Sequence, residues 1–174
     1  MAILRKYSGQ VEQYSIDEAF VDMTGTESLF GNPVIAANTM KDEICQTLGF
    51  TVNVGVSSNK LLAKMASDFK KPNLVHTLFP EEIQVKMWPL PIGELYMAGH
   101  SSVETLKKLE IETIGDLAQS DPALIALHLK SHGKMLWEFA NGIDHSVVQS
   151  EQTEAKGIGN STTLSEDART YEEA

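Results

Sequence analysis

The chain has 174 residues, of which 42% are hydrophobic, and its formal net charge is −10 at pH 7. That length suits one ordinary domain or two small ones with a packed core. The apolar runs are too short to span a bilayer, no signal-peptide pattern is present, and Cys45 is the single cysteine, so we expect no membrane segment, no intrachain disulfide and a cytoplasmic location.

The charge is unevenly distributed along the chain. Residues 1–58 contain three basic and seven acidic side chains, residues 59–75 contain four lysines and one aspartate, and residues 76–174 contain seven basic and sixteen acidic ones. Affinity for nucleic acid comes largely from neutralising phosphates, so the overall charge opposes DNA binding and the lysine-rich stretch favours it. We therefore expect the isolated chain to bind DNA weakly.

The run from Tyr14 to Asp22 places two adjacent carboxylates, Asp17 and Glu18, within an apolar, strand-like segment. Consecutive residues of a regular strand point to opposite faces, so these two can share a site only where the strand ends in a tight turn. The run predicts strand, acidic turn and strand, with a site for hard divalent cations at the tip. The alternative is a pair of solvated carboxylates.

A mixed pattern of helices and strands follows this turn. Asn32 and Pro33 open an amphipathic helix at residues 34–48, which Gly49 ends, and alternating valines predict a strand at residues 51–57. A helix at residues 60–69 and a strand at residues 74–79 complete the layer. This order predicts the α+β class, with helices packed on a sheet.

From Pro80 the pattern changes to short helices separated by turns. It predicts helices at residues 92–97, 102–109 and 114–118, and a further one from 122 to 140. Thr113 and Asp116 have the spacing of a capping box. The second half of the chain is therefore predicted to be a small all-α unit.

Three lysines, Lys60, Lys64 and Lys71, fall within about 40° of one another on a helical wheel. Above an apolar stripe, they would present ammonium groups suited to a triphosphate or a DNA backbone. Pro72 disfavours helical geometry at Lys71, so we expect that side chain to turn toward the site. The alternative is an ordinary solvated lysine face.

A turn lies between two of the predicted helices of the all-α unit. Its residues are Ala98, Gly99, His100, Ser101 and Ser102. A glycine turn before a helix leaves backbone N–H groups free for a phosphate, and the two serine hydroxyls would add donors. The alternative is a plain connection between helices, with His100 at the surface.

These runs resemble signatures of the Y-family DNA polymerases, the translesion group of DinB/UmuC-like and ImpB/MucB/SamB type. Ser15-Ile16-Asp17-Glu18-Ala19-Phe20 is similar to the family's palm signature, and residues 55–64 with Lys71-Pro72 to its second signature. The turn at residues 98–102 resembles the helix-hairpin-helix of the thumb, although the family has two glycines there. Residues 140–144 resemble the end of the thumb, and residues 156–163 the first strand of the little finger.

The resemblance implies a partial palm with an antiparallel-rich sheet at residues 1–79, a thumb at 80–146, and a linker with the start of the little finger at 147–174. It implies magnesium-dependent, template-directed DNA synthesis past lesions, with Asp17 and Glu18 as catalytic ligands of two Mg²⁺ ions. Lys64 and Lys71 would bind the nucleotide's phosphates, and residues 98–102 the DNA backbone. The implied partners are primer–template DNA, deoxynucleoside triphosphates and, for the parent protein, a sliding clamp.

One part of the family pattern is missing. The family's third metal-binding carboxylate lies in a run like Asp-x-Asp-x-Phe-Phe, and none precedes Tyr14. We therefore expect a fragment, the C-terminal palm with the thumb, that is inactive by itself. Two alternatives are a non-catalytic DNA-binding helix-hairpin-helix module and another two-metal enzyme such as a cyclase, which the thumb-like helices disfavour.

Overall fold

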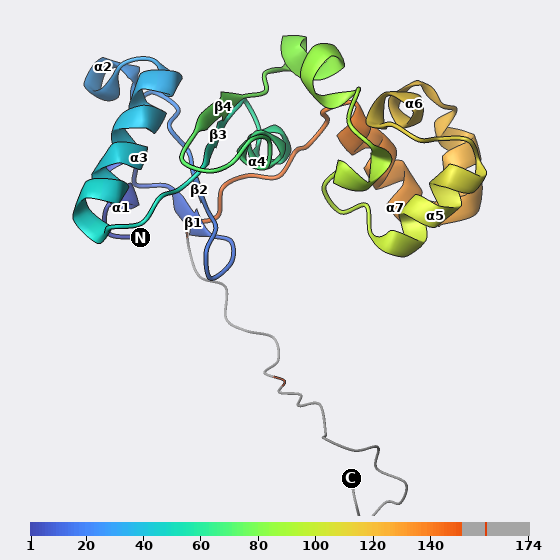
Figure 1. Cartoon of the computed structure of the whole chain (residues 1–174), viewed down its shortest axis with the longest axis horizontal. Helices are drawn as coiled ribbons and strands as arrows, with labels where there is room; N and C mark the ends of the chain where they lie inside the picture. The colour runs from blue at the N-terminus through green and yellow to red at the C-terminus, as the bar shows by residue number, and fades with distance from the viewer. Residues whose placement is uncertain (151–158, 160–174) are drawn as a thin grey trace, which may run out of the picture.

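The computed structural model of the chain describes residues 1–150 and residue 159. An α/β part, blue to green in Figure 1, is followed by a lobe of helices in yellow and orange. The little-finger strand predicted at residues 156–163 lies, except for Gly159, outside the described residues.

The α/β part combines short strands with one long helix. Its elements are α1 (Leu4–Tyr7), β1 (Val11–Gln13), β2 (Ala19–Val21), α2 (Glu27–Phe30), α3 (Pro33–Leu48), β3 (Val54–Val56), α4 (Lys60–Ser67) and β4 (Val75–Thr77). The predicted order of strand, turn, strand, helix, strand, helix and strand is confirmed. The short helices α1 and α2 are additional to it.

The strands form two small sheets. β1 pairs antiparallel with β2, and β3 pairs parallel with β4. Parallel neighbours need a crossover between them, and α4 provides it. The expectation of an antiparallel-rich sheet was therefore wrong for half of the described strands, and these four strands do not join into one sheet.

The helix ends follow the local signals in the sequence. The side chain of Asn32 accepts a hydrogen bond from the N–H of Ile35 (3.0 Å) at the start of α3, and Gly49 closes that helix with a left-handed backbone, φ 75°. At α4 the side chain of Asn59 accepts from the N–H of Leu62 (2.9 Å). The predicted helix starts are thus confirmed, whereas α4 ends at Ser67, two residues earlier than predicted.

The second half of the described chain is helical. Its elements are η1 (Pro80–Glu82), the π-helix η2 (Ile83–Met87), η3 (Ile92–Glu94), α5 (His100–Lys108), α6 (Ile114–Gln119) and α7 (Pro122–Ala140). The helix predicted at residues 92–97 is only a 3₁₀ turn, because Leu95 is extended and Met97 takes a left-handed backbone, φ 69°. The capping box of Thr113 and Asp116 is confirmed.

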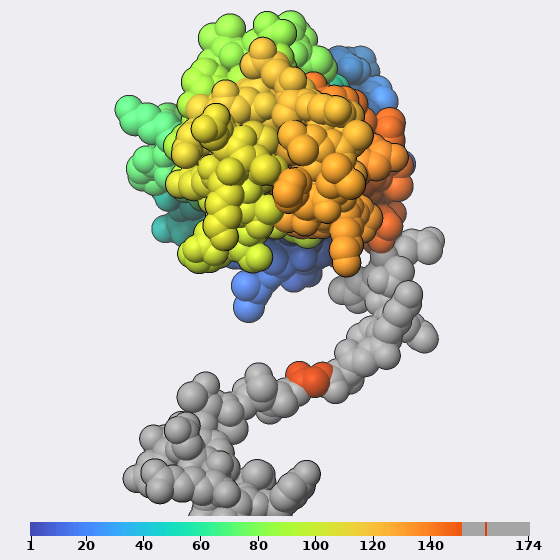
Figure 2. Space-filling model, turned by 90° about the vertical axis from the view of Figure 1, so that its right-hand side faces the viewer, coloured from blue at the N-terminus to red at the C-terminus, as the bar shows by residue number. Residues whose placement is uncertain are grey.

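The main hydrophobic core crosses the border between the two halves. It contains four residues of α4, Leu78 after β4, and buried residues of the helical half. Its members are Leu61, Leu62, Met65, Ala66, Leu78, Ile83, Met87, Ile92, Leu95, Leu106, Ile111, Ile114, Leu117, Ala118, Ile125, Leu136 and Ala140. Figure 2 views the lobe from its end, where α5 (yellow) and α7 (orange) lie side by side. A smaller cluster of Ile3, Tyr7, Met40 and Ile44 joins α1 to α3.

None of the helices in residues 1–150 is long and apolar enough to cross a membrane.

Candidate functional site

The predicted acidic turn is formed as a tight hairpin between β1 and β2. The carbonyl oxygen of Glu18 accepts hydrogen bonds from the N–H groups of Tyr14 (2.9 Å) and Ser15 (3.1 Å). Ile16, at the tip, is 98% exposed. Asp17 is exposed and Glu18 is half-buried, so both carboxylates stand at the end of the strand pair, as predicted.

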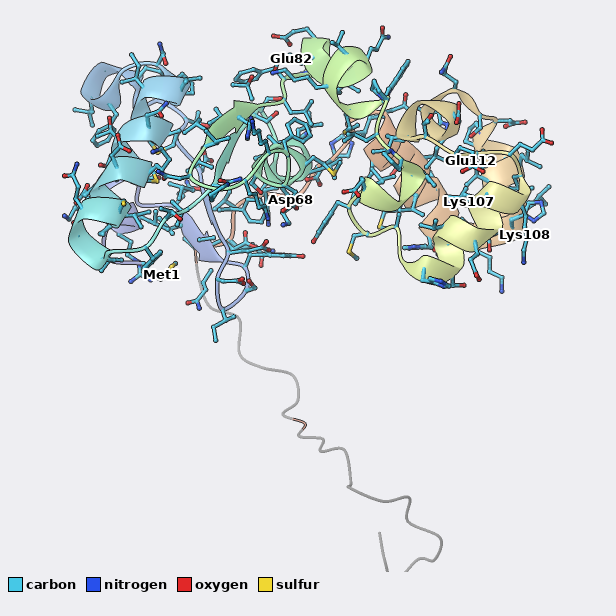
Figure 3. The ribbon with its side chains drawn as sticks, viewed as in Figure 1. Met1, Asp68, Glu82, Lys107, Lys108 and Glu112 are labelled. Carbon is cyan, nitrogen blue, oxygen red and sulfur yellow. The ribbon has the colours of Figure 1, made fainter. Side chains whose placement is uncertain are left out.

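Glu18 begins a chain of ion pairs that leads to Lys71. The ammonium of Lys64 lies 2.6 Å from Oε1 of Glu18 and 2.7 Å from Oδ2 of Asp68, and the ammonium of Lys71 lies 2.9 Å from Oδ1 of Asp68. Figure 3 labels Asp68 beside α4. The predicted site residues Glu18 and Lys64 are thus in direct contact. Asp68, which was not predicted from the sequence, links Lys64 to Lys71.

For Lys64 and Asp68, the effect of ion pairing on the pKa outweighs the effect of burying the charge. Partial burial by itself would lower the pKa of Lys64, but its hydrogen bonds to Asp68 and Glu18 raise that pKa above the usual lysine value. Burial would likewise raise the pKa of Asp68, but the hydrogen bonds from Lys64 and Lys71 lower it. The two groups are therefore charged at neutral pH.

Asp17 lies next to Glu18 but takes no part in this series of ion pairs. Its Oδ1 accepts a hydrogen bond from the hydroxyl of Ser15 (2.7 Å), within the same turn. In the part of the chain that the structure describes, no three His, Cys, Asp or Glu side chains form a group that could hold a metal ion. Asp17 and Glu18 carry carboxylate oxygens, the kind of ligand that Mg²⁺ prefers, but they are two side chains and not a complete ligand set.

Lys60 does not take part in these ion pairs and contacts β1 and Phe20 instead. Its ammonium lies 2.7 Å from Oε2 of Glu12 on β1 and 4.8 Å from the ring centroid of Phe20. Glu12 Oε2 also accepts a hydrogen bond from the N–H of Gln149 (2.8 Å), so this pair holds the segment that follows the helical lobe. Glu12 was not singled out from the sequence, which gives no signal for a contact across 48 residues.

Lys71 reaches the site by a different route from the one predicted. Because α4 ends at Ser67, Lys71 lies in the following loop and the helical-wheel argument was wrong for it. Its side chain is 59% exposed and is directed by its pair with Asp68. The expectation that Lys71 leaves helical geometry is confirmed.

A wide cleft of about 1480 Å³ collects these residues. Asp17 and Glu18 line it from the hairpin, Lys60 and Lys64 from α4, and Lys71 from the loop that follows. The residues of the turn at 98–102 are not among its lining. The cleft therefore unites two of the three predicted constellations.

The third constellation is the N-terminus of α5. Gly99 is the N-cap residue, with φ −71°, and Val103 N–H donates to its carbonyl (3.0 Å), so the N–H groups of residues 100–102 have no partner within the helix. His100 and Ser101 are exposed, as expected. Ser102 is only 9% exposed, so the prediction that both serine hydroxyls are offered at the surface was wrong for Ser102.

The start of α4 is held by residues that come after the helical lobe. Asp144 Oδ2 accepts a hydrogen bond from the N–H of Leu61 (3.0 Å), and the amide of Asn59 donates to the carbonyl of Gly142 (2.9 Å). These contacts fix the helix that carries Lys64. Asp144 belonged to a run that resembles the family's thumb ending, but nothing in the sequence indicated this capping contact.

Comparison with known proteins adds to this geometry. Residues 1–68 match the model of the impB/mucB/samB family. The chain is 49% identical to DNA polymerase IV of Clostridium acetobutylicum over 96% of its length and 42% of the relative's. It is 39% identical to DNA polymerase IV 2 of Bacillus subtilis over 95% of its length and 41% of the relative's.

Solved structures show the same likeness. DinB from Sulfolobus solfataricus superposes with a TM-score of 0.76 at 30% identity, over 86% of this chain and 45% of that one. An insertion ternary complex of Dbh DNA polymerase gives a TM-score of 0.75 at 31% identity, over 86% and 44%. Family model, relatives and structures thus agree in a likeness to the impB/mucB/samB family and to DinB-type DNA polymerases. The chain spans about two-fifths of the length of the curated relatives it matches.

Proposed function

We propose that this chain is the part of a translesion DNA polymerase that contains the acidic hairpin of the palm and the thumb. The observation that carries the proposal is the chain of ion pairs from Glu18 through Lys64 and Asp68 to Lys71, which lines one cleft with Asp17. Carboxylates for metal ions and ammonium groups for phosphates are the components that nucleotidyl transfer needs side by side. The reaction is addition of a deoxynucleotide to a primer 3′-hydroxyl in the cytoplasm.

The residues take separate roles in this proposal. Asp17 and Glu18 would hold Mg²⁺, which, when bound, would neutralise charge on the transferring phosphate. Lys64 and Lys71 would bind the phosphates of the incoming nucleotide, and the free N–H groups of residues 100–102 would bind a phosphate of the DNA backbone. Residues 1–79 would form the palm, 80–146 the thumb, and 147–174 the linker and the start of a little finger.

The proposal is tested in a chimera in which this chain replaces the matching part of the Clostridium acetobutylicum polymerase. We expect primer extension with Mg²⁺ and deoxynucleotides, and a loss of more than about 100-fold in kcat for Asp17→Ala and for Glu18→Ala, because each removes a metal ligand. Glu81→Ala removes an exposed carboxylate on η1 and is the control. Full activity in either cleft variant would contradict the assignment.

A second candidate, a non-catalytic DNA-binding module, is favoured by one observation: the α5 N-terminus is exposed and lies outside the lining of the cleft. This candidate predicts salt-dependent DNA binding that is weakened by changes at Gly99 and Ser101 and unaffected by Asp17→Ala. Binding with that pattern, together with an inactive chimera, would favour the module over the polymerase.

A further inference from the structure

The loop that carries Lys71 is held by side chains outside it. This loop, residues 68–74, connects α4 to β4 and presents Lys71 to the cleft. Lys71 itself is more than half exposed, and the partner of its ammonium is Asp68, a residue of the same loop. What fixes the loop's backbone therefore decides where the ammonium lies.

Asn53 makes three hydrogen bonds to this backbone. Its amide NH₂ donates to the carbonyl of Ser67 (3.1 Å), at the end of α4, and to the carbonyl of Lys70 (3.0 Å). Its amide oxygen accepts from the N–H of Leu74 (3.0 Å), where the loop ends. One half-buried side chain thus closes the loop at both ends and holds the peptide group that joins Lys70 to Lys71.

Two further side chains brace the same loop. Nε2 of His76 lies 2.9 Å from the carbonyl of Lys70, so this oxygen has two partners. Lys41, whose side chain is 9% exposed, donates from α3 to the side chain of Asn73 (3.3 Å). Asn73 has a left-handed backbone, φ 58°, which asparagine tolerates better than most residues.

We propose that Asn53 is a positioning residue that affects nucleotide binding through the Lys71 loop. This inference rests on the proposed function of Lys71. An asparagine side chain supplies both the donors and the acceptor that the two ends of the loop need. Without it, the carbonyls of Ser67 and Lys70 lose their amide donor and the N–H of Leu74 loses its acceptor. The loop then samples positions in which the Lys71 ammonium is displaced from the phosphates.

The test compares Asn53→Ala with Asn141→Ala in the chimera. Asn141, in the helical lobe, is the matched control because its amide also donates to two carbonyls, of Ala118 (3.2 Å) and Trp137 (3.0 Å). We expect both to lower stability, and Asn53→Ala alone to raise KM for the incoming deoxynucleotide about tenfold, with a smaller change in kcat.

The double variant Asn53→Ala with Lys71→Ala separates positioning from simple destabilisation. If Asn53 acts through Lys71, its loss adds nothing to KM once Lys71 is gone. In the 174-residue chain, hydrogen exchange of the Leu74 amide should also quicken in Asn53→Ala and stay unchanged in Asn141→Ala.

The outcomes separate the two proposals. A raised KM in Lys71→Ala with an unchanged KM in Asn53→Ala, or additive effects in the double variant, would overturn the role of Asn53 alone. An unchanged KM in Lys71→Ala would overturn the phosphate-binding role of Lys71 and the inference with it.

Discussion

Gly55 in β3 lies directly against the backbone of Ala63 in α4. A methyl group at Gly55 would lie 1.8 Å from the carbonyl oxygen of Ala63 and 2.6 Å from the N–H nitrogen of Ser67. Both neighbours are backbone atoms of the helix that carries Lys64, so neither can move without shifting that helix. The glycine therefore sets how closely β3 and α4 approach.

Gly55→Ala is expected to lower the free energy of unfolding by about 3 kcal/mol or more, because the strand and the helix must separate. The measurement is urea unfolding followed by circular dichroism. Gly9→Ala is the matched control, since a methyl group there meets nothing within 4 Å, and it should change stability by less than about 0.5 kcal/mol. Equal stability of the two variants would show that this contact is not formed.

Asp144→Ala is expected to destabilise the chain by about 1 kcal/mol, since the carboxylate caps the first turn of α4 through Leu61 N–H. Asp144→Asn keeps an acceptor oxygen and should lose less. Both are measured by urea unfolding. An alanine variant as stable as the unchanged chain would mean that residues after the lobe do not hold α4.

Tyr7 makes stability depend on alkaline pH. Burial, and then the hydrogen bond that its hydroxyl donates to Glu43 (2.6 Å), raise the pKa of Tyr7 from 10.0 to about 12. Because the pKa is higher in the folded state than in the unfolded state, the protonated Tyr7 hydroxyl contributes its full stabilisation of the fold below pH 10. This contribution is lost as the pH rises toward 12.

The free energy of unfolding should therefore fall by about 2–3 kcal/mol more over this range in the unchanged chain than in Tyr7→Phe, which cannot ionise. Urea unfolding at a series of pH values gives the free energy of unfolding against pH for both chains. Lysine titration contributes equally to both curves, so their difference reports on Tyr7. Parallel curves would contradict the burial of Tyr7 against Glu43.

Ser101→Glu should weaken binding of a labelled primer–template duplex about threefold to tenfold at low salt, because it puts a negative charge at the N-terminus of α5 where a phosphate is proposed to bind. Fluorescence anisotropy of the 174-residue chain measures the affinity. Ser131→Glu, an equal charge change at an exposed position on α7, is the control and should have a smaller effect. Equal weakening by both would indicate a general effect of charge.

The 174-residue chain by itself is expected to give no primer extension with Mg²⁺ and deoxynucleotides. Asp17 and Glu18 are two carboxylates where a two-metal site usually needs three. A gel-based extension assay, with the chimera as the positive control, measures this. Extension by the pure chain that is lost in Asp17→Ala would overturn the prediction.

Local signals in the sequence predicted local structure well. Asn32 with Pro33, Asn59, and Thr113 with Asp116 satisfy helix N–H groups within a few residues of the chain, and all three helix starts are where they were predicted. The acidic turn is equally local, since its hydrogen bonds join Glu18 to residues only three and four positions earlier.

Contacts between distant segments were not predictable in this way. The pairs of Glu12 with Lys60 and of Glu18 with Lys64 join residues 48 and 46 positions apart, and Asp144 caps a helix 83 positions earlier. The parallel pairing of β3 with β4 depends on the crossover through α4, and strand periodicity does not specify a partner. Asp68 and Asn53 acquire their roles only once the loop after α4 is in place.

The shared core of α4 and the helical lobe has a mechanical consequence. Since α4 packs with the lobe and is tied to it through Gly142 and Asp144, a rotation of the lobe would carry Lys64 along. Contacts from the β1–β2 hairpin to this unit include the ion pairs Glu18–Lys64 and Glu12–Lys60 and the hydroxyls of Tyr14 and Tyr96. The side chains of Lys60, Glu12 and Lys64 are only 14–15% exposed, so salt weakens these pairs less than it weakens exposed ones. The hairpin is therefore coupled to the same unit, and a rotation of the lobe would also act on the end of the strand pair that carries Glu18.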